Sequence, residues 1–147
     1  MVIATHPKEP KRALYLAEIE GIGEVYADKL GMVGVKTTDD LLAYGATRSG
    51  REKLAAATGL TPQRILEWVD RADLYRISGV GSEYSDLLET AGVDTVLELA
   101  QRNAAHLVTA FGKTVAEHPN IVRRIPTEEE VIDWIEQAKG LARAVEY

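Results

Sequence analysis

Two glycines that flank one aliphatic residue, Gly21-Ile22-Gly23, are the part of this sequence best suited to binding chemistry. Glycine tolerates positive φ and close backbone approach, so the pair permits a tight turn whose aliphatic side chain plugs inward. If the second glycine opens a helix, the first amides of that helix lack intrahelical partners and lie at its positive end. Such a turn can bind a phosphate group. The alternative is a purely structural turn between two helices.

The motif recurs in the second half of the chain as Gly79-Val80-Gly81. Between 19–42 and 77–100, 10 of 24 positions are identical, which indicates an internal duplication. A second repeated segment is Arg64–Val69, which resembles Glu130–Ile135. The sequence offset between these two segments is larger than the offset between the two glycine motifs. The larger offset places an insertion of eight residues in the second unit, around residues 114 to 125.

Helix signals dominate the elements that must position these glycines. The N-terminal signals are Thr61-Pro62 and the capping-box pairs Thr95 with Glu98 and Thr127 with Glu130. Apolar residues recur at helical spacing from 65 to 75 and from 131 to 145. No alternating run of β-branched residues indicates a strand. The sequence therefore predicts an all-α fold.

We expect residues 1–147 to form one compact domain. Its predicted parts are a first unit at about 12–60, a connecting helix at about 61–76, a second unit at about 77–120 and a closing helix at about 127–142. The predicted core is Ile19, Leu30, Val35, Leu41, Ile65, Val69, Ile77, Leu88, Val93, Leu99, Val131 and Ile135. Trp68 and Trp134 are also expected in the core, and the repeated Tyr26 and Tyr84 are expected to pack between the two units.

The composition argues against several classes of protein. The absence of cysteine excludes a disulfide framework and a thiol nucleophile, and the three histidines lack metal-ligand spacing. No nucleophile constellation or Walker loop can be assembled, so we expect no enzyme, no small-molecule substrate and no cofactor. No apolar run approaches the roughly 18 residues of a membrane span, and the N-terminus lacks a signal-peptide core. A cytoplasmic protein with no membrane partner is expected.

The net charge of −6 is concentrated in one half of the chain. Residues 1–76 hold 11 basic and 11 acidic side chains, whereas residues 77–147 hold 6 basic and 12 acidic ones. A protein that binds nucleic acid through bulk electrostatics is normally basic, because Lys and Arg neutralise phosphates. The charge therefore predicts weak nucleic-acid binding at most.

The glycine motif, at residues 19–35, resembles the helix-hairpin-helix motif, and its doubled form resembles the tandem helix-hairpin-helix domain of DNA repair and recombination proteins. A still closer resemblance of the whole chain is carried by Ile19–Gly23, Lys36–Leu42, Arg64–Asp73 and Gly79–Leu88. From about residue 12 to 141, the chain is similar to an uncharacterised prokaryotic family of such domains, catalogued as a domain of unknown function. The resemblance implies two pseudo-symmetric units whose hairpin amides contact duplex phosphates. It also implies that a monovalent cation can sit on the hairpin carbonyls.

Carried over by position, the nucleic-acid-binding residues are Gly21, Ile22, Gly23, Val25, Lys29, Lys36, Gly79, Val80 and Gly81. DNA-binding members usually add Lys or Arg after the second glycine, but this chain has Glu24 there in the first motif and Ser82-Glu83 in the second. Leu87 and Asp94 replace the two lysines in the second unit. The first hairpin is therefore expected to dominate any nucleic-acid binding.

Two functions remain open. The first is a non-catalytic module that binds duplex phosphates weakly and without sequence preference. The second is a protein-interaction or scaffolding module that has lost the basic residues of DNA-binding members. The surface near Gly23 discriminates between them: basic groups from Arg48, Arg51, Lys53 or residues 8–12 would favour DNA, and an acidic rim with exposed apolar residues would favour a protein.

Overall fold

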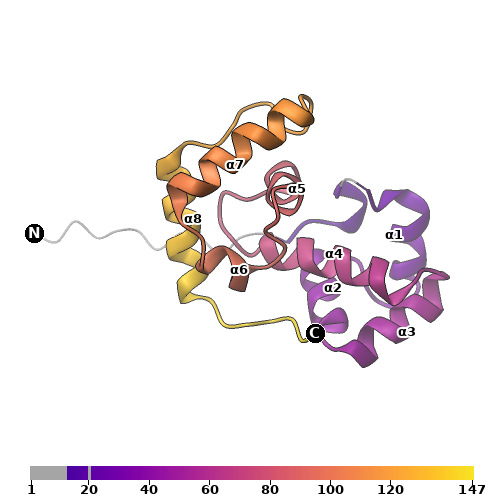
Figure 1. The fold of residues 1–147 in the computed structure, drawn as a ribbon. Helices are drawn as coiled ribbons and strands as arrows, with labels where there is room; N and C mark the ends of the chain where they lie inside the picture. Colours follow the sequence, from indigo (N-terminus) through magenta and orange to yellow (C-terminus); the bar gives the residue numbers. More distant parts are fainter. Residues whose placement is uncertain (1–12, 20) are drawn as a thin grey trace, which may run out of the picture.

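Every regular element in the described part of the chain is helical (Figure 1). The structure, a computed structural model, describes residues 13–19 and 21–147. Its elements are the 3-10 helix η1 (Leu16–Glu18) and the α-helices α1 (Gly23–Gly31), α2 (Thr38–Gly45), α3 (Arg48–Thr58), α4 (Pro62–Leu74), α5 (Ser82–Thr90), α6 (Val96–Ala100), α7 (Ala104–Glu117) and α8 (Glu128–Gly140). None of these helices has both the length and the apolar character that crossing a membrane requires. The all-α prediction is confirmed.

Helices α4 and α8 begin where the sequence places them. The Thr61 hydroxyl accepts a hydrogen bond from the Arg64 amide at 3.2 Å, and Pro62 is the first residue of α4. Proline fits this position because its missing amide would have had no intrahelical acceptor. At α8, Thr127 and Glu130 form the predicted reciprocal capping box.

The predicted capping box at α6 is only half formed. The Thr95 hydroxyl accepts from the Glu98 amide at 3.1 Å, but the Glu98 carboxylate accepts from the Asp94 amide at 3.0 Å, one residue further back. The Val96 amide, in the first turn of α6, donates to the Asp73 carboxylate of α4 at 2.8 Å. The start of this short helix is therefore tied to α4 by a buried carboxylate.

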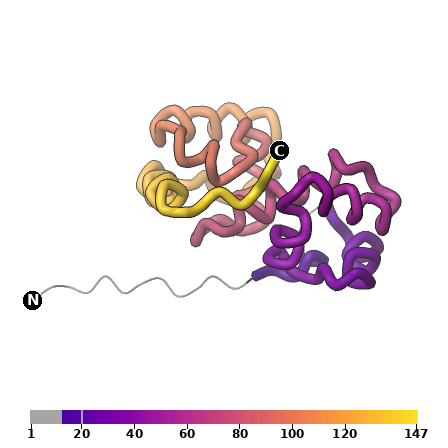
Figure 2. Tube along the Cα trace, turned by 90° about the horizontal axis from the view of Figure 1, so that it is seen from below, coloured from indigo at the N-terminus to yellow at the C-terminus, as the bar shows by residue number. Residues whose placement is uncertain are grey.

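The buried apolar side chains form two clusters. The first cluster is formed by η1 and helices α1, α2, α3 and α4. The second is formed by the last residue of α4 together with α5, α6, α7 and α8. The tube view shows the two corresponding lobes (Figure 2). All twelve predicted core residues are at most 6% exposed, which confirms them: Ile19, Leu30, Val35, Leu41, Ile65, Val69, Ile77, Leu88, Val93, Leu99, Val131 and Ile135.

The second half of the chain is longer between its last two helices. Residues 59–61 connect α3 to α4, whereas residues 118–127 connect α7 to α8. In addition, α7 has 14 residues and α3 has 11. The insertion expected around 114–125 therefore extends α7 and lengthens the loop that follows it.

The predicted closing helix is too long at its C-terminal end. Helix α8 ends at Gly140, and Leu141 is extended, with φ −95° and ψ 140°. Residues 141–147 cross from α8 toward α2 and α3 (Figures 1 and 2). Val145, placed on the helical stripe by its spacing, is instead 2% exposed in the first cluster. Burial in the other half of the molecule thus prevails over a helical pattern that Gly140 already weakens.

Candidate functional site

The first glycine hairpin is a tight turn with its aliphatic residue buried. Gly21 and Gly23 have positive φ values of 91° and 73°. Ile22 between them is 3% exposed and belongs to the first cluster. Its amide donates to the Ile19 carbonyl at 3.3 Å, which closes the turn. The positive φ at Gly21 and the inward-pointing aliphatic side chain, both predicted, are confirmed.

The second hairpin has the same turn but a different second glycine. Gly79 has φ 95°, Val80 is fully buried, and the Val80 amide donates to the Ile77 carbonyl at 3.1 Å. Gly81 has φ −99°, which any residue can adopt. A Cβ atom at Gly79 would lie 3.0 Å from Nε1 of Trp134, so packing adds to the conformational requirement for glycine there.

The helices that follow the two hairpins, α1 and α5, differ from the other described α-helices at their N-termini. Neither Ile22 nor Gly81, at the N-cap positions, gives the first turn a side-chain hydrogen bond. The N-cap side chain of every other described α-helix accepts one: Thr37, Thr47, Thr61, Thr95, Asn103 and Thr127. Since first-turn amides have no intrahelical acceptor, α1 and α5 begin without the acceptor that the other helices carry.

The two lysines assigned to the first hairpin lie near the other end of α1. The Lys29 ammonium is 3.4 Å from the Thr58 carbonyl oxygen and 5.5 Å from the centre of the Tyr26 ring. Lys36 is exposed and shares a shallow depression with Met32, just after α1. Both positive charges therefore neighbour the last turn of α1, and Gly23 is in its first.

Three large apolar side chains on or beside η1 and α1 are exposed. Val25 and Met32 on α1 and its C-cap are 65% and 86% exposed, and Tyr15 before η1 is 59% exposed. Glu24, directly after the hairpin, is exposed as well. This is the type of rim that the sequence analysis associates with a protein partner.

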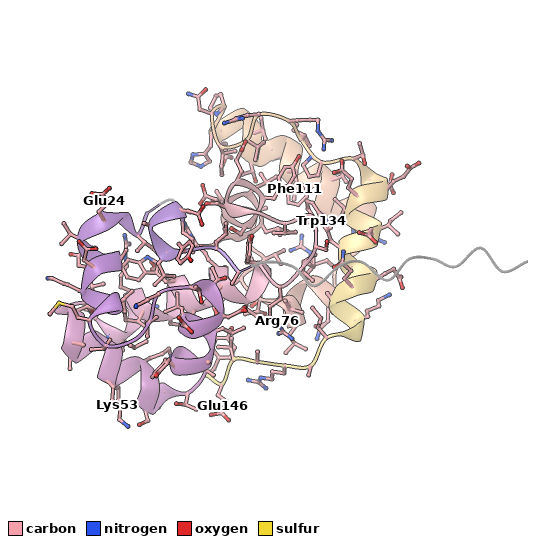
Figure 3. The ribbon with its side chains drawn as sticks, turned by 180° about the vertical axis from the view of Figure 1, so that it is seen from behind. Glu24, Lys53, Arg76, Phe111, Trp134 and Glu146 are labelled. Carbon is pink, nitrogen blue, oxygen red and sulfur yellow. The ribbon has the colours of Figure 1, made fainter. Side chains whose placement is uncertain are left out.

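Arg51 and Lys53 of α3 do not supply a positive edge to this hairpin. Arg51 is 4% exposed and donates to the carbonyls of Gly45 and Ala46 at 2.8 and 3.1 Å. Lys53 lies at the opposite end of its lobe from Glu24 (Figure 3). The basic residues at 8–12 lie outside the described residues.

An arginine that the sequence analysis did not single out lies against the first hairpin. Nη1 of Arg71, on α4, is 3.5 Å from the position that a Cβ atom of Gly21 would take. The same guanidinium donates to Glu89 at 2.7 Å and to Asp86 at 3.0 Å, both on α5. Burial lowers the pKa of Arg71, but the hydrogen bond to Glu89 and the negative charges of Glu89 and Asp86 raise it by more. The pKa of Arg71 is therefore raised above its usual value. Arg71 thus joins the first hairpin to α5.

Gln137 occupies the position in the second half that matches Arg71 when Arg64–Val69 is aligned with Glu130–Ile135. Its side-chain amide accepts from the Ser78 amide at 2.8 Å and donates to the Ser78 carbonyl at 3.0 Å. The second hairpin is therefore held by α8 through a two-point bond. Extending that alignment by two positions pairs Arg71 with Gln137, so the sequence alone could have pointed to both as residues that contact the glycine motifs.

The loop inserted between α7 and α8 brings two arginines to the second hairpin. The Arg123 amide donates to the Glu83 carboxylate, while the Arg123 side chain is 95% exposed with Nε 3.9 Å from Glu83. Arg124 donates to both oxygens of Glu130 at 2.6 and 3.0 Å, and these bonds hold the pKa of Glu130 at about 2. Both arginines line an open depression, together with Gly79, Gly81 and Glu83. The carboxylate of Glu83 is thus held against the loop.

The repeated tyrosines pack within each half, not between the halves as the sequence analysis expected. The Tyr26 ring centre lies 5.7 Å from that of Trp68, and the Tyr84 ring centre lies 5.2 Å from that of Trp134. Both tryptophans are buried, as predicted. The tyrosines lie on α1 and α5, the helices that follow the glycine motifs, and the tryptophans lie on α4 and α8. Because these helices correspond in the duplication, both pairs repeat.

The described residues thus form an all-helical protein in which two glycine turns precede helices whose N-cap residues give no side-chain hydrogen bond. No group of three or more acidic or histidine side chains within 13–19 and 21–147 is arranged to hold a metal ion. Residues 20–141 match the family described as "Domain of unknown function (DUF4332)", and the chain belongs to this family. No curated protein and no solved structure matches the chain.

Proposed function

We propose that this protein is a non-catalytic binding module built from two helix-hairpin-helix units, whose hairpin amides bind the phosphates of duplex nucleic acid. One observation carries the proposal: α1 and α5, the helices that follow the glycine motifs, begin without a capping side chain. A phosphate oxygen is an acceptor suited to this position, because it meets the first-turn amides and the positive end of the helix dipole together. Backbone donors aimed at phosphates imply binding without sequence preference.

The second hairpin is the stronger candidate for this contact. The Arg123 side chain extends into solvent beside it, and Glu83 is already engaged by the inserted loop. At the first hairpin, Lys29 is directed to the Thr58 carbonyl at the far end of α1. Because few cations are available, we expect weak binding with a shallow salt slope, on the order of two to four phosphates neutralised.

Fluorescence anisotropy of labelled duplexes of arbitrary sequence, titrated at several salt concentrations, tests this proposal. Arg123→Glu should weaken binding at least ten-fold, since it reverses a charge beside the phosphate site. Lys53→Glu is the matched control, because it makes the same charge change at the far end of the other lobe, and it should bind like the wild type. Loss of binding in Lys29→Glu/Lys36→Glu, with Arg123→Glu unaffected, would contradict this assignment and move the contact to the C-terminal end of α1.

A protein-interaction module is the second candidate function, and the exposed apolar side chains of Tyr15, Val25 and Met32 favour it. These three side chains are each more than half exposed, and the neighbouring Glu24 would repel a phosphate. If no duplex, single-stranded or junction DNA binds at low salt, this function is the better explanation of the fold.

A further inference from the structure

Residues 141–147 bind to the first half of the molecule as an extended segment, although they follow α8 in the second half. Val145 is the clearest sign, because its side chain is 2% exposed and belongs to the first cluster, with residues of η1 and α1 to α4. The two views of the chain show this segment leaving α8 and ending beside the other lobe (Figures 1 and 2). The first half therefore binds this segment, and we refer to the contacted surface of α2, α3 and α4 as the groove.

The groove binds the main chain of the segment through a buried arginine. The Glu146 amide donates to the Ala46 carbonyl at 2.8 Å, and the Glu146 carbonyl accepts from Nη2 of Arg51 at 2.6 Å. Arg51 is 4% exposed and is positioned by the Gly45 and Ala46 carbonyls. The side chain of Glu146 is exposed, as Figure 3 shows, so this part of the contact recognises extended backbone and not a particular side chain.

Two side chains of the segment are recognised individually. Val145 fills the apolar cluster, and the Tyr147 hydroxyl donates to Oδ1 of Asp70 on α4 at 2.9 Å. Residues two positions apart in an extended segment point to the same side, which is why both reach the groove. Asp70 is 9% exposed, so the hydroxyl binds a carboxylate that water hardly reaches. The first half thus contacts a buried aliphatic side chain and, two positions later, the hydroxyl of a tyrosine whose ring is partly exposed.

A short stretch connects these anchors back to α8. Between Gly140 and Val145, the Ala142 carbonyl accepts from Nη2 of Arg76 at 2.7 Å. A cavity of about 120 Å³ lies beside the whole segment, and its lining includes Val96, Leu141, Val145 and Tyr147. The segment is therefore tethered to α8 at one end and bound to the first half of the molecule at the other.

We infer that the surface of α2, α3 and α4 is a docking groove for an extended peptide in which an aliphatic residue is followed two positions later by tyrosine, and that residues 141–147 occupy this groove in cis. A segment of the same chemistry from a partner protein would compete for it. Tethering gives the cis segment an effective concentration on the order of millimolar, so a partner binds well only when the cis segment is displaced or weakened. This inference is independent of the glycine hairpins.

A peptide in trans tests the inference on the full-length chain. The ligand is a labelled synthetic peptide of residues 139–147, titrated against the wild type and against Val145→Asp, in which a charge opposes cis docking. We expect the peptide to bind Val145→Asp at least ten-fold more tightly than the wild type. Glu146→Gln is the matched control, because its side chain is exposed, and it should behave as the wild type.

The peptide itself supplies the specificity control without altering the protein. A peptide that carries Val145→Asp should not bind, and one that carries Tyr147→Phe should bind several-fold more weakly. Equal binding of all three peptides, or no binding to a helical Val145→Asp chain at millimolar peptide, would overturn the inference. If circular dichroism shows that Val145→Asp has lost helix, Val145→Ala takes its place with the same expected order of affinities.

Discussion

Replacing Gly79, Gly21 and Gly81 one at a time with alanine separates the conformational requirement from the packing requirement. Gly79 has φ 95°, and a Cβ atom there would lie 3.0 Å from Nε1 of Trp134, a side chain that is 2% exposed and has little room to move. The left-handed backbone costs a non-glycine residue about 1–2 kcal/mol. Overpacking against a buried ring adds about 1–3 kcal/mol. Gly79→Ala should therefore lower the free energy of unfolding by about 2–5 kcal/mol.

The other hairpin glycines serve as graded controls. Gly21 has φ 91°, but its Cβ would be 3.5 Å from Nη1 of Arg71, an ordinary contact, so Gly21→Ala should cost about 1–2 kcal/mol. Gly81 has φ −99° and nothing within 4 Å, so Gly81→Ala should be neutral or stabilising by up to about 1 kcal/mol. Urea titrations of the three variants at equal m-value give these differences. A Gly79→Ala midpoint equal to that of Gly81→Ala would refute the hairpin geometry.

Two further predictions concern the second core and the groove. Leu88 is fully buried, so Leu88→Ala should cost about 2–5 kcal/mol on denaturant titration, and a loss below about 1 kcal/mol would show that it is not core. Burial raises the pKa of Asp70 from 3.8 to about 7. The hydrogen bond from Tyr147 lowers this pKa, and the nearby negative charges of Asp94 and Asp73 raise it. A raised carboxyl pKa favours the folded state when protonated, so its stabilisation is complete below pH 3.8 and is lost as the pH rises to about 7. Asp70→Asn should remove that decline in urea midpoints measured between pH 4 and 8, and an unchanged pH profile would contradict the assignment.

Most of the fold could be predicted from the sequence because its signals are local. The caps at Thr61 and Thr127 satisfy amides a few residues away, and the helical stripes that contain Ile65 and Val131 each bury one face. The duplication added a check, since each core position in one half had a counterpart in the other. These signals do not depend on where distant segments meet.

The features that the sequence did not predict are long-range contacts. Ala142 and Val145 keep the helical spacing of α8, and nothing local shows that Val145 is buried against residues from the first half of the chain. Arg51 resembles a surface residue in a basic run, but it is buried because three carbonyl oxygens accept its hydrogen bonds. Arg123 becomes a neighbour of Gly81 through the fold of the inserted loop. Each case depends on tertiary packing, which local periodicity does not encode.

The proposal that the hairpin amides bind phosphate is tested most directly by amide chemical-shift mapping. A ¹⁵N-labelled chain would be titrated with a short duplex of arbitrary sequence at low salt, and Arg123→Glu would be titrated in parallel. The account predicts shifts concentrated at Gly81 and Glu83, with smaller ones at Gly23 and Val25, that a second duplex of unrelated sequence reproduces and that Arg123→Glu reduces. Shifts confined to α3 or to residues 141–147, or none at millimolar duplex, would contradict the proposal.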